Sequence, residues 1–225
     1  MLTAGARDLV WLFLALELTS LPTYVMVAVA KDRLQTQESA VKYFFLGAMA
    51  VAMFLYGFTL MYGATGTTRL YPTGLDPSQS LSIAQYVIDL QGHPPPLFIL
   101  GLALSLIGIS FKIAAVPMHF YTADVYQGAS TAVTGFLAFV PKTAGFAAMI
   151  VLLGVVGWPL PQPILWLLWI MAATTMTVGN VLGLLQNNVK RLLAYSSIAQ
   201  SGYMLVGLLA GPAIVPAMEG LIGNG

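Results

Sequence analysis

The sequence predicts an all-α, polytopic transmembrane helical bundle. Only 8% of its 225 residues are charged and 58% are apolar, whereas a soluble domain carries roughly 25% charged residues. The apolar residues form uniform segments of about 20 residues, the length that crosses roughly 30 Å of hydrocarbon. Transmembrane β-barrels instead alternate polar and apolar residues over about ten positions. Lipid is therefore expected to surround most of this chain.

Six membrane spans of this kind can be recognised. They cover approximately residues 9–30, 40–62, 97–116, 132–154, 164–185 and 189–209, and we interpret residues 1–225 as a single membrane domain. Polar or proline-rich turns separate them: Lys31-Asp32-Arg33 after the first span and residues 159–163 after the fourth. In the long connection 63–96, the apolar residues between 81 and 90 indicate either an interfacial helix or an ordinary loop with one short helix.

The distribution of basic residues predicts the orientation. The side that holds the amino terminus receives Arg7 and Arg69, and the opposite side receives five basic residues: Lys31, Arg33, Lys42, Lys190 and Arg191. Basic residues favour the cytoplasmic side. We therefore predict an external amino terminus, with the 31–39 turn in the cytoplasm or an organelle matrix. The chain is expected in a bacterial inner membrane or, alternatively, an organelle inner membrane.

Several classes of chemistry are excluded or unsupported. The sequence has no cysteine and two histidines, so disulfides and cysteine-ligated zinc or iron–sulfur centres cannot form. Nucleotide-binding glycine motifs, paired haem histidines and a nucleophile elbow are also missing from the sequence. The net charge of +1 gives no reason to expect nucleic acid. We predict that this chain binds no cofactor and that its work is transport.

Three charged residues lie inside predicted spans, where charge is expensive. Glu17 and Lys142 lie near the middle of the first and fourth spans, and Lys112 lies in the last third of the third. An ionised group at mid-membrane costs roughly 2.5–3.5 kcal/mol on insertion scales, so such residues usually line a polar path and pair with one another. The alternative is an inert buried ion pair that ties helices together.

Two further lysines lie close to span ends. Lys42 lies three residues into the second span, and the alternative for it is that its side chain snorkels to the cytoplasmic surface. Lys190 opens the last span beside Arg191. The alternative for Lys190 and Arg191 is that they anchor the topology rather than conduct protons.

Prolines accompany all three buried charges. Pro22 and Pro117 follow Glu17 and Lys112 by five residues, and Pro141 directly precedes Lys142. Each proline frees the carbonyl four residues earlier, and interrupted helices mark translocation sites in membrane transporters.

The sequence predicts a discontinuous helix near residues 112–117. The polar stretch 118–130 that follows is interpreted as a second half-helix inside the bundle. His119 in this stretch suits a proton relay because histidine titrates near neutrality. The alternative is a histidine in a surface loop.

Five strings resemble the antiporter-like membrane subunits of respiratory complex I, the proton-pumping NADH:quinone oxidoreductase, and most closely its subunit N group. They are LELTSLP at 16–22, ESAVKYF at 38–44, GISFKIAAVPMH at 108–119, DVYQGA at 124–129 and NVKRLLAYSS at 188–197. They run through nearly the whole chain in the family's order and spacing.

The resemblance implies a fold of about fourteen helices with two inverted repeats and broken central helices. It matches Glu17, Lys42, Lys112 and Lys142 to charged residues of the family's fifth to eighth helices. The family's lysine on its twelfth helix and the first four helices have no counterpart here, so a truncated or split copy is expected. The apolar first six residues and the Gly- and Pro-containing end from 211 also suggest a piece of a larger protein.

The functional expectation is a proton-translocating membrane subunit driven by redox chemistry elsewhere. The candidate proton-translocation residues are Glu17, Lys42, Lys112, His119, Lys142 and Lys190. The resemblance implies that partner subunits hold NAD, flavin, iron–sulfur clusters and quinone, and that the partners are other membrane subunits of complex I. Two alternatives stay open: a subunit of a cation/proton antiporter or membrane-bound hydrogenase, and a non-functional structural fragment.

Overall fold

The computed structural model describes residues 1–29, 34–72, 81–91 and 93–222. This part of the chain forms eight helices: α1 (Leu9–Val29), α2 (Leu34–Thr65), α3 (Ile83–Asp89), α4 (Pro96–Ile113), α5 (Tyr121–Gly128), α6 (Thr131–Val156), α7 (Gln162–Leu184) and α8 (Val189–Ile222). Six of them, α1, α2, α4, α6, α7 and α8, are long and apolar enough to cross a membrane. The predicted fold class and the number of spans are therefore confirmed.

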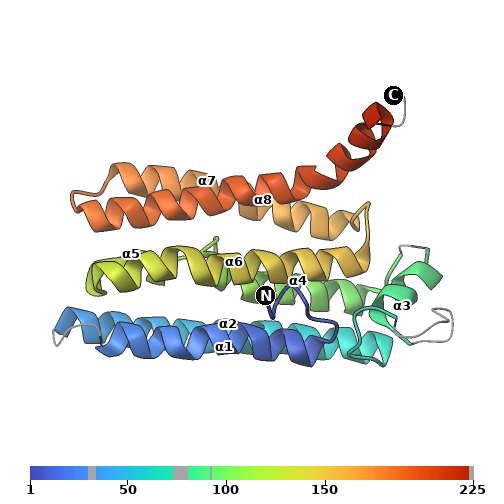
Figure 1. Ribbon diagram of the computed structural model, residues 1–225, viewed down its shortest axis with the longest axis horizontal. Helices are drawn as coiled ribbons and strands as arrows, with labels where there is room; N and C mark the ends of the chain where they lie inside the picture. Colours follow the sequence, from blue (N-terminus) through green and yellow to red (C-terminus); the bar gives the residue numbers. More distant parts are fainter. Residues whose placement is uncertain (30–33, 73–80, 92, 223–225) are drawn as a thin grey trace.

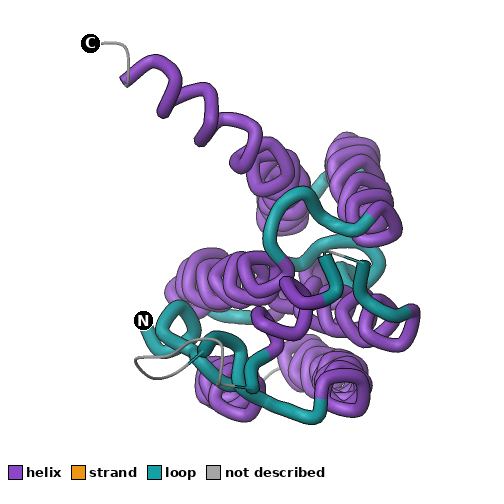
Figure 2. The backbone as a smooth tube through the Cα atoms, turned by 90° about the vertical axis from the view of Figure 1, so that its right-hand side faces the viewer, coloured by secondary structure: helices purple, strands orange, loops and turns teal. Residues whose placement is uncertain are grey.

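The long helices run side by side and form three layers (Figure 1). Helices α1 and α2 make one outer layer, α4 to α6 the central layer, and α7 with α8 the other outer layer. Figure 2 looks along the bundle and shows the end of α8 extending away from the other helices. The central layer contacts both outer layers, so its polar residues can meet partners from either side.

Glycines let the backbone of α4 approach α2 closely. A methyl group added at Gly108 would lie 2.6 Å from the backbone nitrogen of Phe54 and 2.7 Å from the carbonyl oxygen of Ala50. Because lipid is as apolar as the helix surfaces, membrane helices associate largely through such close packing. The same argument applies to Gly179, which faces the backbone of Ala199 in α8.

The predicted discontinuous helix is present. Helix α4 ends at Ile113, and Ala114 adopts a left-handed conformation with φ 56°. Helix α5 begins at Tyr121, and six of its eight residues are buried. It packs against α2 and α8. The predicted second half-helix inside the bundle is therefore present.

The other two prolines do not interrupt their helices. Helix α1 continues through Pro22 and α6 continues through Pro141. The expectation of a broken helix at each buried charge is therefore wrong for Glu17 and Lys142. A proline removes a single hydrogen bond, and membrane helices tolerate that loss because hydroxyl side chains and neighbouring helices satisfy the backbone.

The connection between α2 and α4 holds one short helix, α3. Ile83 and Val87 of this helix are buried and join the main apolar core. The backbone of residues 7–9 pairs with that of 68–70 at the same end of the bundle, through Leu9 N to Thr68 O and Leu70 N to Arg7 O. The described part of this connection is thus a folded cap on one end of the bundle.

Candidate functional site

A buried ion pair joins α1 and the end of α4. The side chain of Lys112 is 3% exposed and that of Glu17 is 16% exposed, and Lys112 Nζ lies 3.7 Å from Glu17 Oε1. Lys112 also donates a hydrogen bond to the hydroxyl of Ser20. Ser20 lies one helical turn after Glu17, so both groups are on the face of α1 that looks toward α4.

The second buried lysine has a different environment. Lys142 Nζ of α6 donates to three oxygens of α8: the carbonyl of Ser197 at 2.5 Å, the hydroxyl of Ser197 at 2.7 Å and the hydroxyl of Ser201 at 2.9 Å. An ammonium group has three donors, so this set of oxygens satisfies all of them. Among the ion pairs of the described residues, none includes Lys142.

One hydroxyl connects the two lysine environments. Ser201 Oγ, which accepts from Lys142, donates to the carbonyl oxygen of Ile113 at 2.6 Å. Ile113 is the last residue of α4 and directly follows Lys112. A methyl group at Gly145 of α6 would lie 2.9 Å from Lys112 Cβ, so α6 packs directly on this lysine. The carbonyl predicted to be freed by Pro117 therefore has a partner from α8.

The interruption after α4 is lined by polar groups. Val116 N donates to Thr175 Oγ1 of α7 at 2.9 Å, and the Tyr121 hydroxyl donates to the Phe111 carbonyl at 2.7 Å. His119 is buried, so it is not a histidine in a surface loop. Within the described residues, its Nδ1 has no hydrogen-bond partner.

Lys42 and Lys190 lie at one end of the bundle rather than with the buried lysines. The side chain of Lys42 is 45% exposed and pairs with Glu38 at 2.7 Å and Asp124 at 3.1 Å. Lys190 Nζ donates to the carbonyl of Ala129 at 3.1 Å, in the turn between α5 and α6. The structure therefore brings together Glu17, Lys112 and Lys142, with His119 in the adjoining break, and separates the two remaining candidates from them.

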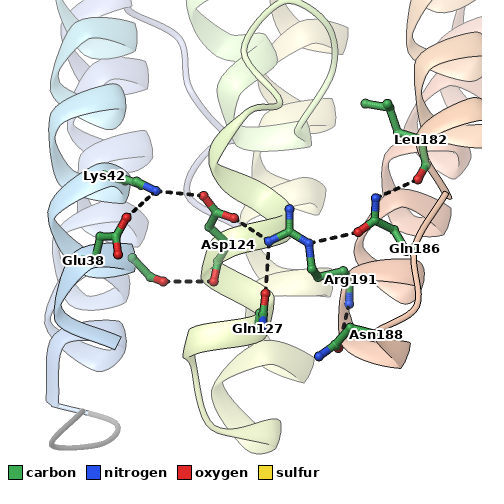
Figure 3. A network of polar contacts seen from close by, with 9 residues as sticks. Glu38, Lys42, Asp124, Gln127, Leu182, Gln186, Asn188 and Arg191 are labelled. Carbon is green, nitrogen blue, oxygen red and sulfur yellow. Dashed lines mark hydrogen bonds and ion pairs between the residues drawn. The ribbon is translucent and has the colours of Figure 1, made fainter. Parts of the chain in front are cut away.

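A polar network at this end joins all three layers, and we call it the rim network (Figure 3). Asp124 of α5 is its centre: one carboxylate oxygen binds Lys42 of α2, and the other accepts from Arg191 Nη1 of α8 at 2.6 Å. Arg191 also donates to Gln127 and Gln186, each at 3.0 Å. The rim network consists of Glu38, Lys42, Asp124, Gln127, Gln186 and Arg191.

The rim network keeps Asp124 ionised. Partial burial raises the pKa of this carboxyl, but hydrogen bonds from Arg191 and Lys42 outweigh burial and hold the pKa below its ordinary value. A carboxyl group whose pKa is lower in the folded state stabilises the fold at pH values above its ordinary pKa. This contribution to stability is lost as the pH falls through the pKa of the folded state. At neutral pH the connection between the layers is therefore intact.

Sequence reasoning missed three hydroxyl groups of the site: those of Ser20, Ser197 and Ser201. Serine carries no charge, and its hydroxyl commonly bonds a carbonyl of its own helix, so its presence in a span is unremarkable. Only helix packing distinguishes these three. Within the described residues, no group of three or more His, Asp or Glu side chains lies close enough together to hold a metal ion.

Comparison with known proteins agrees with this architecture. Residues 6–222 match the family described as the transmembrane region of NADH:quinone oxidoreductases and Mrp antiporters. The chain belongs to this family. It is a multi-pass membrane protein, as the six apolar helices independently indicate.

Among the family's members, subunits named NADH-quinone oxidoreductase subunit N are highly similar to this chain. The subunit from Trichlorobacter lovleyi is 47% identical over 216 residues, which are 95% of this chain and 42% of the relative. That from Mycobacterium tuberculosis is 44% identical over 93% of this chain and 38% of the relative. The chain thus spans about two fifths of the length of these relatives.

Solved structures show the same fold. A chain of respiratory complex I from Thermus thermophilus superimposes with a TM-score of 0.74 at 41% identity, covering 92% of this chain and 42% of that one. A chain of the Mrp complex from a Dietzia species gives 0.73 over 90% of this chain and 36% of that one, at 22% identity. The latter similarity concerns the fold alone.

Proposed function

We propose that this chain is a proton-conducting part of a membrane subunit of an NADH:quinone oxidoreductase and works as a single membrane domain. The observation that carries the proposal is the buried series of Glu17, Lys112 and Lys142 across the interruption after α4. Buried titratable groups in contact across helices are typical of proton relays. The high identity to subunits N favours this function over the antiporter or hydrogenase alternatives.

The two lysines would conduct in sequence. A proton held by Lys112 is stabilised by Glu17, and loss of that contact would favour its transfer through the interruption toward Lys142. The oxygens of Ser197 and Ser201 then stabilise the ammonium of Lys142 by hydrogen bonds. His119 lies in the interruption and is available as a further acceptor.

The electron-transfer reaction would take place in partner subunits. NAD, flavin, iron–sulfur clusters and quinone are assigned to those partners, which are other subunits of the same complex. This chain would contribute the membrane path and be driven by conformational change at its neighbours. We place Lys42 and Lys190 at the entrance of the proton path. Lys42 belongs to the rim network, and Lys190 lies beside it.

Arginine variants test the proton path without removing charge. Lys112→Arg and Lys142→Arg, introduced in the complete complex, retain a cation, but arginine does not release its proton at neutral pH. We expect NADH-driven proton pumping in membrane vesicles to fall at least about tenfold in each variant. The measurement is quenching of a pH-sensitive dye, with NADH:quinone reduction followed in parallel.

Gln85→Ala is the control because Gln85 lies in α3, outside the series of buried charges, and its side-chain amide donates to Asp89 of the same helix. This variant should pump normally. Normal pumping in both arginine variants would contradict the proposal and favour an inert ion pair. Sodium-driven proton exchange without NADH would instead favour the antiporter alternative.

A further inference from the structure

We propose that Ser201 is a positioning residue that couples the protonation state of Lys142 to the end of α4 beside Lys112. The inference deepens the proposed function and rests on it in one respect, namely that Lys142 gains and loses a proton. Ser201 is fully buried and lies between Lys142 and the last residue of α4. It belongs to α8, the helix that also provides the Ser197 oxygen bound to Lys142.

The single proton of the Ser201 hydroxyl is the basis of the coupling. Ser201 Oγ lies 2.9 Å from Lys142 Nζ, 2.6 Å from the Ile113 carbonyl oxygen and 3.1 Å from the Ser197 carbonyl oxygen. An ammonium group only donates. While Lys142 is protonated, Ser201 must therefore present a lone pair to it and direct its own proton to a carbonyl, of which Ile113 is the nearer.

Deprotonation of Lys142 changes what this hydroxyl can do. A neutral amine has a lone pair and accepts hydrogen bonds, so the Ser201 proton can turn toward Lys142. The Ile113 carbonyl then loses its donor. In a buried site the loss matters, because an unsatisfied carbonyl has no water to replace the missing partner.

The Ile113 carbonyl is placed where such a loss would move Lys112. It lies in the final turn of α4, directly before the left-handed residue Ala114. A methyl group at Gly145 would lie 2.7 Å from Ile113 Cγ2 and 2.9 Å from Lys112 Cβ, so α6 holds this turn on one side. Ser201 of α8 provides a further attachment, in addition to the hydrogen bonds of Tyr121 to the Phe111 carbonyl and of Val116 N to Thr175. Loss of the Ser201 hydrogen bond weakens the hold on this turn and lets it shift relative to Glu17.

Other titratable groups face the same region and must be separated from Lys142 in any titration. Lys112 of α4 and its partner Glu17 of α1 lie across the interruption, and His119 lies within it. Tyr126 of α5 interacts with Ser197. Removal of Lys142 alone isolates its contribution from these groups.

The test is an NMR titration of the full chain in lipid nanodiscs. Labelling isoleucine at the carbonyl carbon with ¹³C and alanine at nitrogen with ¹⁵N marks only the Ile-Ala peptide bonds, which start at Ile83, Ile113 and Ile198. A second sample with ¹⁵Nζ-lysine follows Lys142 directly. From about pH 5 to about pH 11, we expect the Ile113 carbonyl signal to move upfield as Lys142 loses its proton.

Three variants decide the result. In Ser201→Ala the chemical shift of the Ile113 carbonyl should already be near that of a carbonyl without a hydrogen bond. This shift should not change as Lys142 titrates. In Ser201→Thr, which keeps a hydroxyl, the coupling should be retained; this variant keeps the test sound if the alanine variant does not fold. In Lys142→Gln the coupled shift should disappear. The Ile83 signal, outside the site, reports folding in every sample.

The outcomes separate this inference from the proposed function. An Ile113 signal that follows Lys142 equally in Ser201→Ala would overturn the role of Ser201 and leave the proton path intact. A Lys142 nitrogen that titrates without moving Ile113 in the unmodified chain would do the same. A Lys142 nitrogen that never titrates would contradict the proton role of Lys142 and the coupling together.

Discussion

At the scale of single residues, two lysines are buried by different means. Lys112 has a carboxylate partner in Glu17, whereas the ammonium of Lys142 is surrounded by neutral oxygens of Ser197 and Ser201. A charge pair within a low-dielectric interior is sensitive to small movements of either partner. Hydroxyl groups can turn and exchange donor and acceptor roles without moving the helix. Each lysine therefore responds to a different kind of change.

The Glu17–Lys112 pair predicts non-additive effects on stability. Glu17→Gln or Lys112→Gln alone leaves one buried charge without its partner, which costs about 3–5 kcal/mol in comparable sites. The double variant removes both charges and should recover most of that loss. The measurement is the free energy of unfolding of the membrane-embedded chain by steric trapping.

The same variants distinguish a proton relay from an inert tie. For a relay, the double variant in the complete complex regains stability but not pumping. Recovery of both properties would show that the pair only holds α1 and α4 together. Additive losses of stability would mean that the two side chains do not interact.

At the scale of elements, the interruption between α4 and α5 depends on close packing elsewhere in α4. Gly108 lets α4 lie directly on the backbone of α2, which positions the last turn with Lys112 and Ile113 against α1, α6 and α8. The turn has one face toward Glu17 and another toward Ser201. The continuous part of α4 thus determines where its broken end lies.

A single methyl group should test this packing. Gly108→Ala would place its Cβ 2.6 Å from backbone nitrogen and 2.7 Å from backbone oxygen of α2, so overpacking of about 1–3 kcal/mol is expected. Gly135→Ala in α6 is the matched control because nothing lies within 4 Å of its added methyl. Thermal denaturation in one detergent should show a lower midpoint for Gly108→Ala only. Equal midpoints would mean that α2 yields to the methyl group.

At the scale of the whole molecule, one end of the bundle carries the rim network of charged and polar side chains. The rim network joins α2 and α8 through Asp124 of α5, at the end that the distribution of basic residues predicts to be cytoplasmic. The opposite end carries α3 and the backbone pairing of residues 7–9 with 68–70. The rim network therefore connects the three layers at one end, whereas the backbone pairing at the other end joins the start of α1 to the segment that follows α2.

The orientation itself stays a prediction and can be measured directly. The sequence has no cysteine, so Asp89→Cys and Asn187→Cys each introduce a unique thiol at exposed positions on opposite ends of the bundle. A membrane-impermeant maleimide should label residue 89 in intact cells and residue 187 only after permeabilisation. The reverse pattern would invert the topology.

The sequence by itself determined the solvent, the number of spans, the break after Lys112 and the three charged residues inside the spans, Glu17, Lys112 and Lys142. Each follows from a local cost: an apolar segment needs lipid, and a charge inside such a segment needs partners. Tertiary structure alone decided which charges meet. Lys42 and Lys142 are the same residue type, yet Lys42 pairs at the rim, because the register of α2 places it beside Asp124. Only the packed bundle brings Ser201 to Ile113, 88 residues away in sequence, since an uncharged hydroxyl carries no sign of its partner until the helices come together.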